Sequence, residues 1–125
     1  MKLIHAVFIL FMLAAAACSS DSSPAGSETA PASQAREISV IARQWEFEPS
    51  QITVKEGERV ILHVESVDVE HGFAIPEFGI NENLAPGKSV DIEFTADMAG
   101  SYSFFCSVYC GSGHTSMRGT LIVES

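Results

Sequence analysis

The feature that most limits the fold of this chain is a series of short apolar–polar alternations that begins after residue 35. A period of two is typical of a β-strand with one buried face, and no stretch shows a convincing period of 3.6 residues. The breaks E-P-S, K-E-G-E, A-P-G-K and M-A-G each contain Pro or Gly, the usual turn residues. The pattern predicts an all-β sandwich or barrel. Its expected strands span 37–42, 51–54, 59–64, 89–94, 101–105 and 120–123.

One of these runs, R-V-I-L-H-V, separates two faces clearly. Val60, Leu62 and Val64 alternate with Ile61 and His63. The first three should face the core because side chains on a strand point to opposite sides in turn. We therefore interpret His63 as a solvent-side residue of a strand rather than as a metal ligand.

The first seventeen residues resemble an export signal. Lys2 gives a positive start, and the apolar run 6–17 is shorter than the roughly 20 residues that span a bilayer as a helix. The run ends in A-A-A-C, which resembles the lipobox of bacterial lipoproteins, in which the cysteine is lipidated and becomes the mature N-terminus. The resemblance implies a signal peptide over 1–17 and a lipidated Cys18. The alternative is an ordinary cleaved signal, and in both cases the protein is exported, to the periplasmic side of a membrane.

Residues 18–35 have almost no large apolar side chains. Such a segment cannot bury enough surface to offset the entropy of ordering, so we expect a flexible tether. Its root-mean-square reach is about 20–25 Å. The folded domain is then expected over 36–125.

The charge of the chain is strongly acidic. All sixteen Asp and Glu residues follow position 20, so removing 1–17 leaves six basic side chains against sixteen acidic ones. This balance argues against nucleic-acid binding, which depends on Lys and Arg to neutralise phosphates. It favours attraction to a cationic partner, or it is simply a solvated acidic surface.

One short loop gathers four soft donors. Cys106, Cys110, His114 and Met117 form the pattern C-x3-C-x3-H-x2-M, and V-E-H-G-F upstream adds His71 in a break after a strand. In an exported protein, two nearby cysteines can form a disulfide. The accompanying imidazole and thioether instead indicate copper, because a zinc site has no use for Met.

The number of copper ions follows from the number of thiols. A mononuclear blue-copper site takes two His, one Cys and a weak axial Met. His71, Cys110, His114 and Met117 would suffice for it, and Cys106 would then be surplus. Two thiolates in one loop can instead bridge two copper ions, each with one imidazole and one weak ligand. The donors alone are compatible with both a mononuclear and a binuclear site.

The loop and the upstream H-G-F resemble the binuclear CuA domain of cytochrome c oxidase subunit II, most closely the short subunit II of bacterial ba-type oxidases. The likeness covers essentially all of 36–125, including L-A-P-G-K and the final M-R-G-T-L-I-V. It implies a cupredoxin-like Greek-key β-sandwich that binds two copper ions. By the resemblance, two thiolates bridge the coppers, one imidazole binds each, and a thioether and a backbone carbonyl are axial. These roles fall on Cys106 and Cys110, His71 and His114, Met117, and Val108.

Two departures from that family affect the function expected. Many members have Glu where this chain has Val108, and its carboxylate helps to hold a magnesium ion beside the large oxidase subunit, so we do not expect that ion here. The transmembrane hairpin that usually precedes the domain is also not seen, which makes a tethered, self-standing carrier plausible.

The resemblance implies one-electron transfer between a redox protein such as a c-type cytochrome and a haem-copper oxidase or another reductase. Trp45, in A-R-Q-W-E-F, resembles part of the aromatic stretch through which such domains receive electrons, or it is a packing residue. Met98, in T-A-D-M-A-G, is interpreted as a packing residue beside a turn.

The sequence argues against two other classes of function. Copper chaperones and sensors for oxidase assembly can carry C-x3-C and a distant His, but those factors are thioredoxin-like and need alternating strands and helices. For an enzyme, the sequence offers no G-x-S-x-G, H-E-x-x-H, C-x-x-C-H or patterned carboxylate pair. We therefore expect no catalytic residues and no turnover by the domain alone, although it could be a component of an oxidase.

Overall fold

The computed structural model describes residues 34–125, which form nine strands and two short 3-10 helices. The strands are β1 Arg36–Arg43, β2 Glu46–Glu48, β3 Gln51–Lys55, β4 Arg59–Ser66, β5 His71–Ile75, β6 Ile80–Leu84, β7 Ser89–Thr95, β8 Gly100–Phe105 and β9 Arg118–Glu124. The 3-10 helices are η1 Pro76–Phe78 and η2 His114–Ser116. The expected signal peptide, the lipidation site Cys18 and nearly all of the tether lie outside the described residues.

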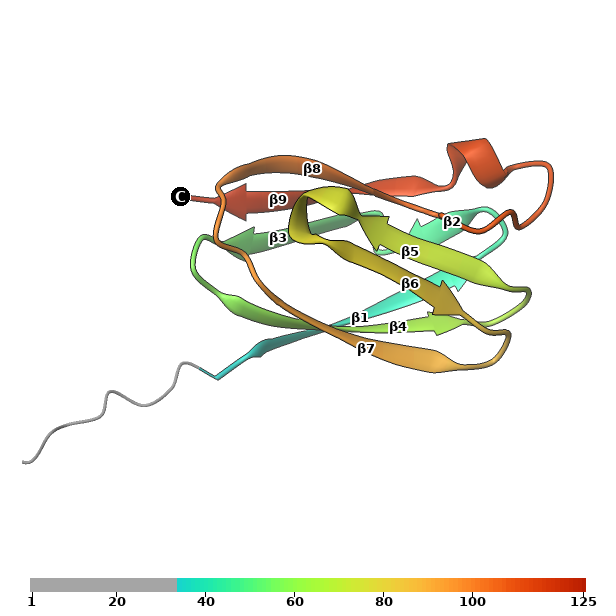
Figure 1. The fold of residues 1–125 in the computed structure, drawn as a ribbon, viewed down its shortest axis with the longest axis horizontal. Helices are drawn as coiled ribbons and strands as arrows, with labels where there is room; N and C mark the ends of the chain where they lie inside the picture. Colours follow the sequence, from blue (N-terminus) through green and yellow to red (C-terminus); the bar gives the residue numbers. More distant parts are fainter. Residues whose placement is uncertain (1–33) are drawn as a thin grey trace, which may run out of the picture.

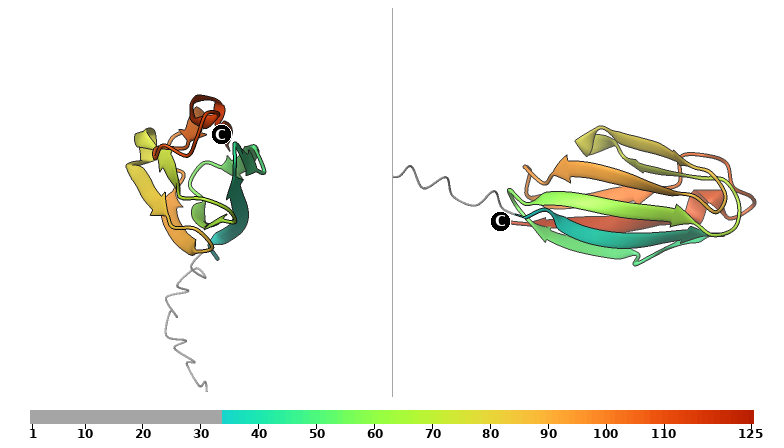
Figure 2. Two further views of the ribbon diagram at one scale, coloured as in Figure 1. Left: turned by 90° about the vertical axis from the view of Figure 1, so that its right-hand side faces the viewer. Right: turned by 90° about the horizontal axis from the view of Figure 1, so that it is seen from below.

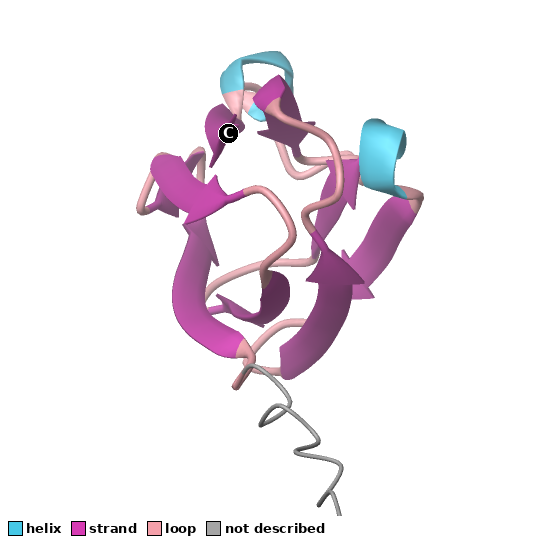
Figure 3. Ribbon diagram, turned by 90° about the vertical axis from the view of Figure 1, so that its left-hand side faces the viewer, coloured by secondary structure: helices cyan, strands magenta, loops and turns pink. Residues whose placement is uncertain are grey.

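The strands make two sheets that pack face to face (Figure 1). One has the order β2-β1-β4-β7 and the other β3-β9-β8-β5-β6. The pairs β1/β4 and β3/β9 are parallel, and the remaining pairs are antiparallel. The chain passes repeatedly from one sheet to the other. Further views show the two layers around a common interior (Figures 2 and 3). The prediction of an all-β Greek-key sandwich is confirmed.

Three buried phenylalanines join the two sheets. Phe47 of β2 contacts Phe73 of β5 and Phe104 of β8 edge to face, with ring centroids 5.4 and 5.5 Å apart. Phe73 and Phe104 stack at 5.2 Å. Aromatic pairs of this kind add about 0.5–1.5 kcal/mol beyond the burial of their area. The cluster gives a rigid base to the strands that carry His71 and lead to Cys106.

Six strands appear where the alternation predicts them, with ends shifted by one or two residues, but the pattern does not reveal β2, β5 and β6. β2 has only three residues, and β6 (I-N-E-N-L) is an edge strand with a polar centre. β5 (H-G-F-A-I) is buried along its whole length, so it has no alternation to detect. The placement of His71 in a break was therefore wrong, because this residue begins β5.

The two ends of the sandwich differ. The start of β1 and the C-terminus lie at one end, whereas η2 and the start of β5 lie at the other (Figure 1). No helix within residues 34–125 is long and apolar enough to cross a membrane.

The expected division of β4 into two faces is confirmed. Val60, Leu62 and Val64 are fully buried, while His63 lies on the outer face of the sheet. The His63 Nδ1 atom is 2.6 Å from Asp91 Oδ1 on β7, and Nε2 is 3.5 Å from Glu37 Oε2 on β1. The imidazole thus links three strands, and these interactions, above all the hydrogen bond to Asp91, raise the pKa of His63 above its ordinary value.

We predict that His63 stabilises the domain more in acid than in alkali. Its folded-state pKa is raised, so its stabilisation is complete below the unfolded pKa of about 6.5 and is lost as the pH rises through the folded pKa. His63→Gln should therefore lower the free energy of unfolding more at about pH 5.5 than at about pH 8.5. Urea unfolding of both proteins measures this difference. An equal loss at the two pH values would contradict the prediction.

Candidate metal centre

The loop between β8 and β9 meets the start of β5 at one end of the sandwich. It brings His71, Cys106 and Cys110 together, with donor atoms all within 4.8 Å of one another. Each of the three residues is buried, and His71 is 0% exposed. These side chains come from segments more than thirty residues apart, so the fold rather than the local loop builds the group.

The two thiols are close but not bonded. Cys106 Sγ and Cys110 Sγ are 3.5 Å apart, well beyond the roughly 2.0 Å of a disulfide bond, and both cysteines are free. The disulfide considered from the sequence is therefore absent from the described residues.

Each thiol has its own imidazole and its own weak donor. Cys106 Sγ is 3.9 Å from His71 Nδ1 and 3.0 Å from the Val108 carbonyl oxygen. Cys110 Sγ is 3.7 Å from both His114 Nδ1 and Met117 Sδ. The structure thus brings every predicted ligand to one place, in two sets of three donors that meet at the sulfur pair.

The two imidazoles differ in their exposure. His71 is fully buried, whereas His114 is half-buried at the start of η2 and packs near the exposed ring of Tyr109, with centroids 5.7 Å apart. A redox group held here would have a short path to solvent through His114.

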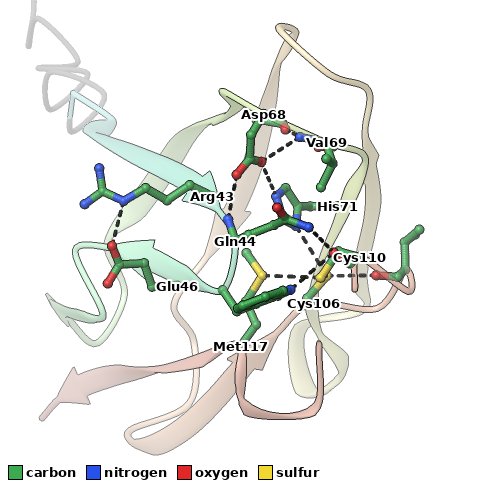
Figure 4. A network of polar contacts seen from close by, with 12 residues as sticks. Arg43, Gln44, Glu46, Asp68, Val69, His71, Cys106, Cys110 and Met117 are labelled. Atoms are coloured by element: carbon green, nitrogen blue, oxygen red, sulfur yellow. Dashed lines mark hydrogen bonds and ion pairs between the residues drawn. The ribbon is translucent and has the colours of Figure 1, made fainter. Parts of the chain in front are cut away.

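Asp68 orients the buried imidazole (Figure 4). Its Oδ1 atom is 2.7 Å from His71 Nε2, which leaves Nδ1 directed to Cys106. Burial alone would raise the pKa of the Asp68 carboxyl, but hydrogen bonds from the backbone of Gln44 and Val69 and from His71 lower it overall. A charged carboxylate behind a ligating histidine fixes its tautomer and its ring orientation. The sequence analysis did not identify Asp68, although its place three residues before His71 was an available signal.

The environment of Cys110 opposes its ionisation. Burial raises the pKa of this thiol to about 12, and the hydrogen bond and charge of Cys106 and the charge of Asp68 act in the same direction. Because the thiolate is the form that binds metals, a metal ion must displace a proton here.

A turn from the other sheet closes the site. The Gln44 side-chain amide donates to the Cys110 carbonyl oxygen at 2.7 Å, and the Trp45 indole N–H donates to the same oxygen at 3.2 Å. The Trp45 ring lies so close to Gly113 that a Cβ on that glycine would come within 2.3 Å of it. Trp45 is 39% exposed, so it packs on the ligand loop at the rim of the site and not in the core.

The glycine after His71 allows the ligand loop to approach β5. A Cβ at Gly72 would lie 2.8 Å from the Val108 backbone nitrogen and 2.9 Å from that of Ser107. The Gly72 N–H also points to Cys106 Sγ at 3.4 Å. The backbone therefore supplies a hydrogen-bond donor to the Cys106 thiol. A side chain at position 72 would displace this donor.

The donor set fits copper. A tetrahedral zinc ion, with bonds of about 2.3 Å to sulfur and about 2.0 Å to nitrogen, holds these atoms roughly 3.5 Å apart, and copper binds the same donor types. The imidazole–thiol distances of 3.9 and 3.7 Å lie within a few tenths of that value. Thiolate, imidazole and thioether together are soft ligands that favour copper.

Comparison with known proteins agrees with this geometry. The chain matches the cupredoxin-like domain family over residues 3–123. It belongs to that family. It is 33% identical over 87 residues to a cytochrome c oxidase subunit 2 from Thermus thermophilus, covering 70% of this chain and 64% of the relative. A nitrous-oxide reductase from Pseudomonas fluorescens is 34% identical over 79 residues, covering 60% of this chain and 12% of the reductase.

A solved structure of a heme-copper terminal oxidase dimer contains a similar chain. The TM-score is 0.66 at 29% identity, and the match covers 71% of this chain and 65% of that one. The cupredoxin therefore spans less than two thirds of the length of these relatives. The resemblance to oxidase subunit II stated from the sequence is confirmed.

We predict that Gly72→Ala destabilises the metal-free domain by about 1–3 kcal/mol, because its methyl group forces the backbone of the ligand loop away from β5. Thermal unfolding measures the loss. Ser107→Ala is the control, since the Ser107 hydroxyl is the nearest atom to the new methyl group, at 2.1 Å. If the double variant Gly72→Ala/Ser107→Ala regained full stability, the new methyl group would displace only the Ser107 hydroxyl. The predicted clash with the backbone of Ser107 and Val108 would then be wrong.

Proposed function

We propose that this cupredoxin is a one-electron carrier with a binuclear copper centre of the CuA type. The observation that carries the proposal is the pair of buried thiols 3.5 Å apart, each with a separate imidazole and a separate weak donor. Cys106 and Cys110 would bridge the two ions. His71 and His114 would bind one ion each, and Met117 and the Val108 carbonyl would be the weak ligands.

A single copper ion accounts less well for the same residues. A mononuclear site would use Cys110 and leave Cys106 as a buried thiol 3.5 Å from the bound sulfur. Cys106 instead has its own contacts with His71 and Val108, which are of the same kind as those of Cys110 with His114 and Met117. The parallel sets of contacts favour two ions.

Copper supplies a one-electron change between its two common oxidation states. The protein's part is to hold all donors in place, most of them buried, so that little rearrangement accompanies the change of charge. Asp68 holds His71, the Gly72 N–H points to Cys106, and the Phe47–Phe73–Phe104 cluster supports both strands. Six donors would fill the coordination of the two ions and would leave no position for a substrate, so we propose no catalytic residue.

The rim of the site suits a redox partner with a basic surface. Tyr109 of the ligand loop and Trp45, which bonds to that loop, are exposed large apolar residues, and the chain has a net charge of −9. An apolar contact on a protein of net negative charge favours fast, transient docking of a basic partner. We propose a c-type cytochrome or similar carrier as the donor, with electrons entering through His114 or Trp45, whose indole donates to the Cys110 carbonyl.

The acceptor is proposed from the relatives' names to be a haem-copper oxidase or another reductase. Because Val108 offers no carboxylate, a magnesium ion shared with such an enzyme is not part of the proposal. Export and a lipid anchor at Cys18 remain predictions from the sequence, and they would keep the domain at the periplasmic face of a membrane.

We predict two copper ions per domain that share one unpaired electron. Metal analysis and low-temperature electron paramagnetic resonance of the copper-loaded protein test this directly. Hyperfine coupling to two equivalent copper nuclei, with two coppers bound, is the expected result. Coupling to one nucleus with one copper would instead identify a blue-copper site. A spectrum that stays silent after mild oxidation, with one Cu(I), would favour the chaperone class.

We predict different roles for the strong and weak ligands. Met117→Leu should retain both coppers and change the reduction potential, because an axial thioether tunes the site more than it holds the metal. His114→Ala or Cys110→Ser should lose the binuclear spectrum. Met98→Leu is the matched control, since Met98 is an exposed methionine outside the ligand loop. Loss of copper in Met117→Leu together with full occupancy in His114→Ala would contradict the assignment.

A further inference from the structure

We propose that Gln44 is a positioning residue of this centre, which together with Trp45 locks the Cys110 half of the site to the His71 half. The inference rests on the proposed copper site, but Gln44 and Trp45 themselves bind no metal. Gln44 is an exposed residue in the turn between β1 and β2. Within residues 34–125, it is the one residue that hydrogen-bonds both to Asp68, which holds His71, and to the Cys110 carbonyl oxygen.

On the first side, the backbone of Gln44 holds Asp68. The Gln44 N–H donates to Asp68 Oδ2 at 2.7 Å, and the Val69 N–H donates to Oδ1 at 2.6 Å. The same Oδ1 contacts His71 Nε2 at 2.7 Å. The position of the His71 ring therefore depends on a carboxylate whose other oxygen is tied to the turn.

On the second side, the side chain of Gln44 holds the ligand loop. Its amide donates to the Cys110 carbonyl at 2.7 Å, and the Trp45 indole donates to the same oxygen. A carbonyl oxygen has two lone pairs, so the two donors satisfy it fully. Figure 4 shows Gln44 between Asp68 and Cys110.

The turn that makes both contacts is itself fixed. β1 lies between β2 and β4, pairing with β4 over the whole length from Arg36 to Ala42. The Val67 N–H, one residue before Asp68, also donates to the Ala42 carbonyl at 3.2 Å. The distance between the His71 and Cys110 halves is thus fixed by the turn after β1, which belongs to the sheet opposite β5, β8 and β9.

Two donors to one carbonyl predict a non-additive effect. With Trp45 still in place, Gln44→Leu should weaken copper binding by only a few-fold, and Trp45→Phe likewise. The double variant leaves the Cys110 carbonyl without either donor and should weaken binding about 10- to 100-fold, as is usual for outer partners of metal ligands. Gln44→Glu should weaken binding more than Gln44→Leu, because it places an acceptor against an acceptor.

The test is chelator competition for copper with the full chain, in the four variants and in Gln51→Leu, an exposed glutamine of β3. The hyperfine spectrum of each copper-loaded protein and the unfolding free energy of each apoprotein are measured in parallel. The expected result is a super-additive loss of affinity with an altered spectrum, while Gln51→Leu matches the wild type. A loss that only follows the apoprotein's stability, with an unchanged spectrum, would overturn the positioning role. The positioning role would also be overturned if the affinity losses of Gln44→Leu and Trp45→Phe simply added in the double variant and were no larger than the loss in Gln51→Leu.

Two further comparisons apply if the double variant does not fold or if the proposed copper site is wrong. If the double variant does not fold, the comparison of Gln44→Glu with Gln44→Leu decides, and equal affinities reject the proposal. If the wild type binds no copper pair, the proposed function fails, and the positioning role is then read from the apoprotein. In that case the nitrogen resonances of the His114 ring, in the half that the Gln44 side chain holds through Cys110, must shift in Gln44→Leu relative to Gln51→Leu, and unchanged resonances reject it.

Discussion

A fully buried imidazole needs a partner for each of its two nitrogens, and the site is built around this requirement at His71. Asp68 takes Nε2, and the Cys106 thiol faces Nδ1. Within residues 34–125, no buried side-chain nitrogen or oxygen lacks a partner. An unpaired group at this depth would cost about 1–3 kcal/mol, so the loop that bears Asp68 and the strand that leads to Cys106 have to converge.

The sandwich makes that convergence possible. β5 brings His71 in at the end of one sheet, β8 delivers Cys106 beside it, and β9 draws the end of the ligand loop back so that Met117 is buried. Gly72 lets the loop lie against β5, where any side chain would separate them. The opposite sheet contributes through the turn after β1. Stability and site geometry thus share the same contacts, so most substitutions near the thiols should change both.

The sequence was sufficient for the all-β class, the six alternating strands and the set of soft donors, because each depends on local periodicity or on residue chemistry. It did not place His71 at the start of a strand, since β5 is buried on both sides and shows no alternation. It also missed Asp68 and Gln44. Their roles arise from contacts between loops that are distant along the chain, and a lone Asp or Gln in a turn is ordinary. Trp45 was identified from the sequence as a residue for electron entry or packing, but its contact with Gly113 was visible only in three dimensions.

The separation of Arg36 from the ligand loop has a practical consequence for attaching this domain to anything. β1 runs eight residues from one end of the sandwich towards the other, about 25 Å at the usual rise of a strand. A domain fixed to an electrode, a resin or a scaffold through its N-terminal side can present the His114 edge outward, free for contact. Attachment near Tyr109 would do the reverse and put the metal loop against the support. The attachment site therefore decides whether the metal loop faces the support or a partner in solution.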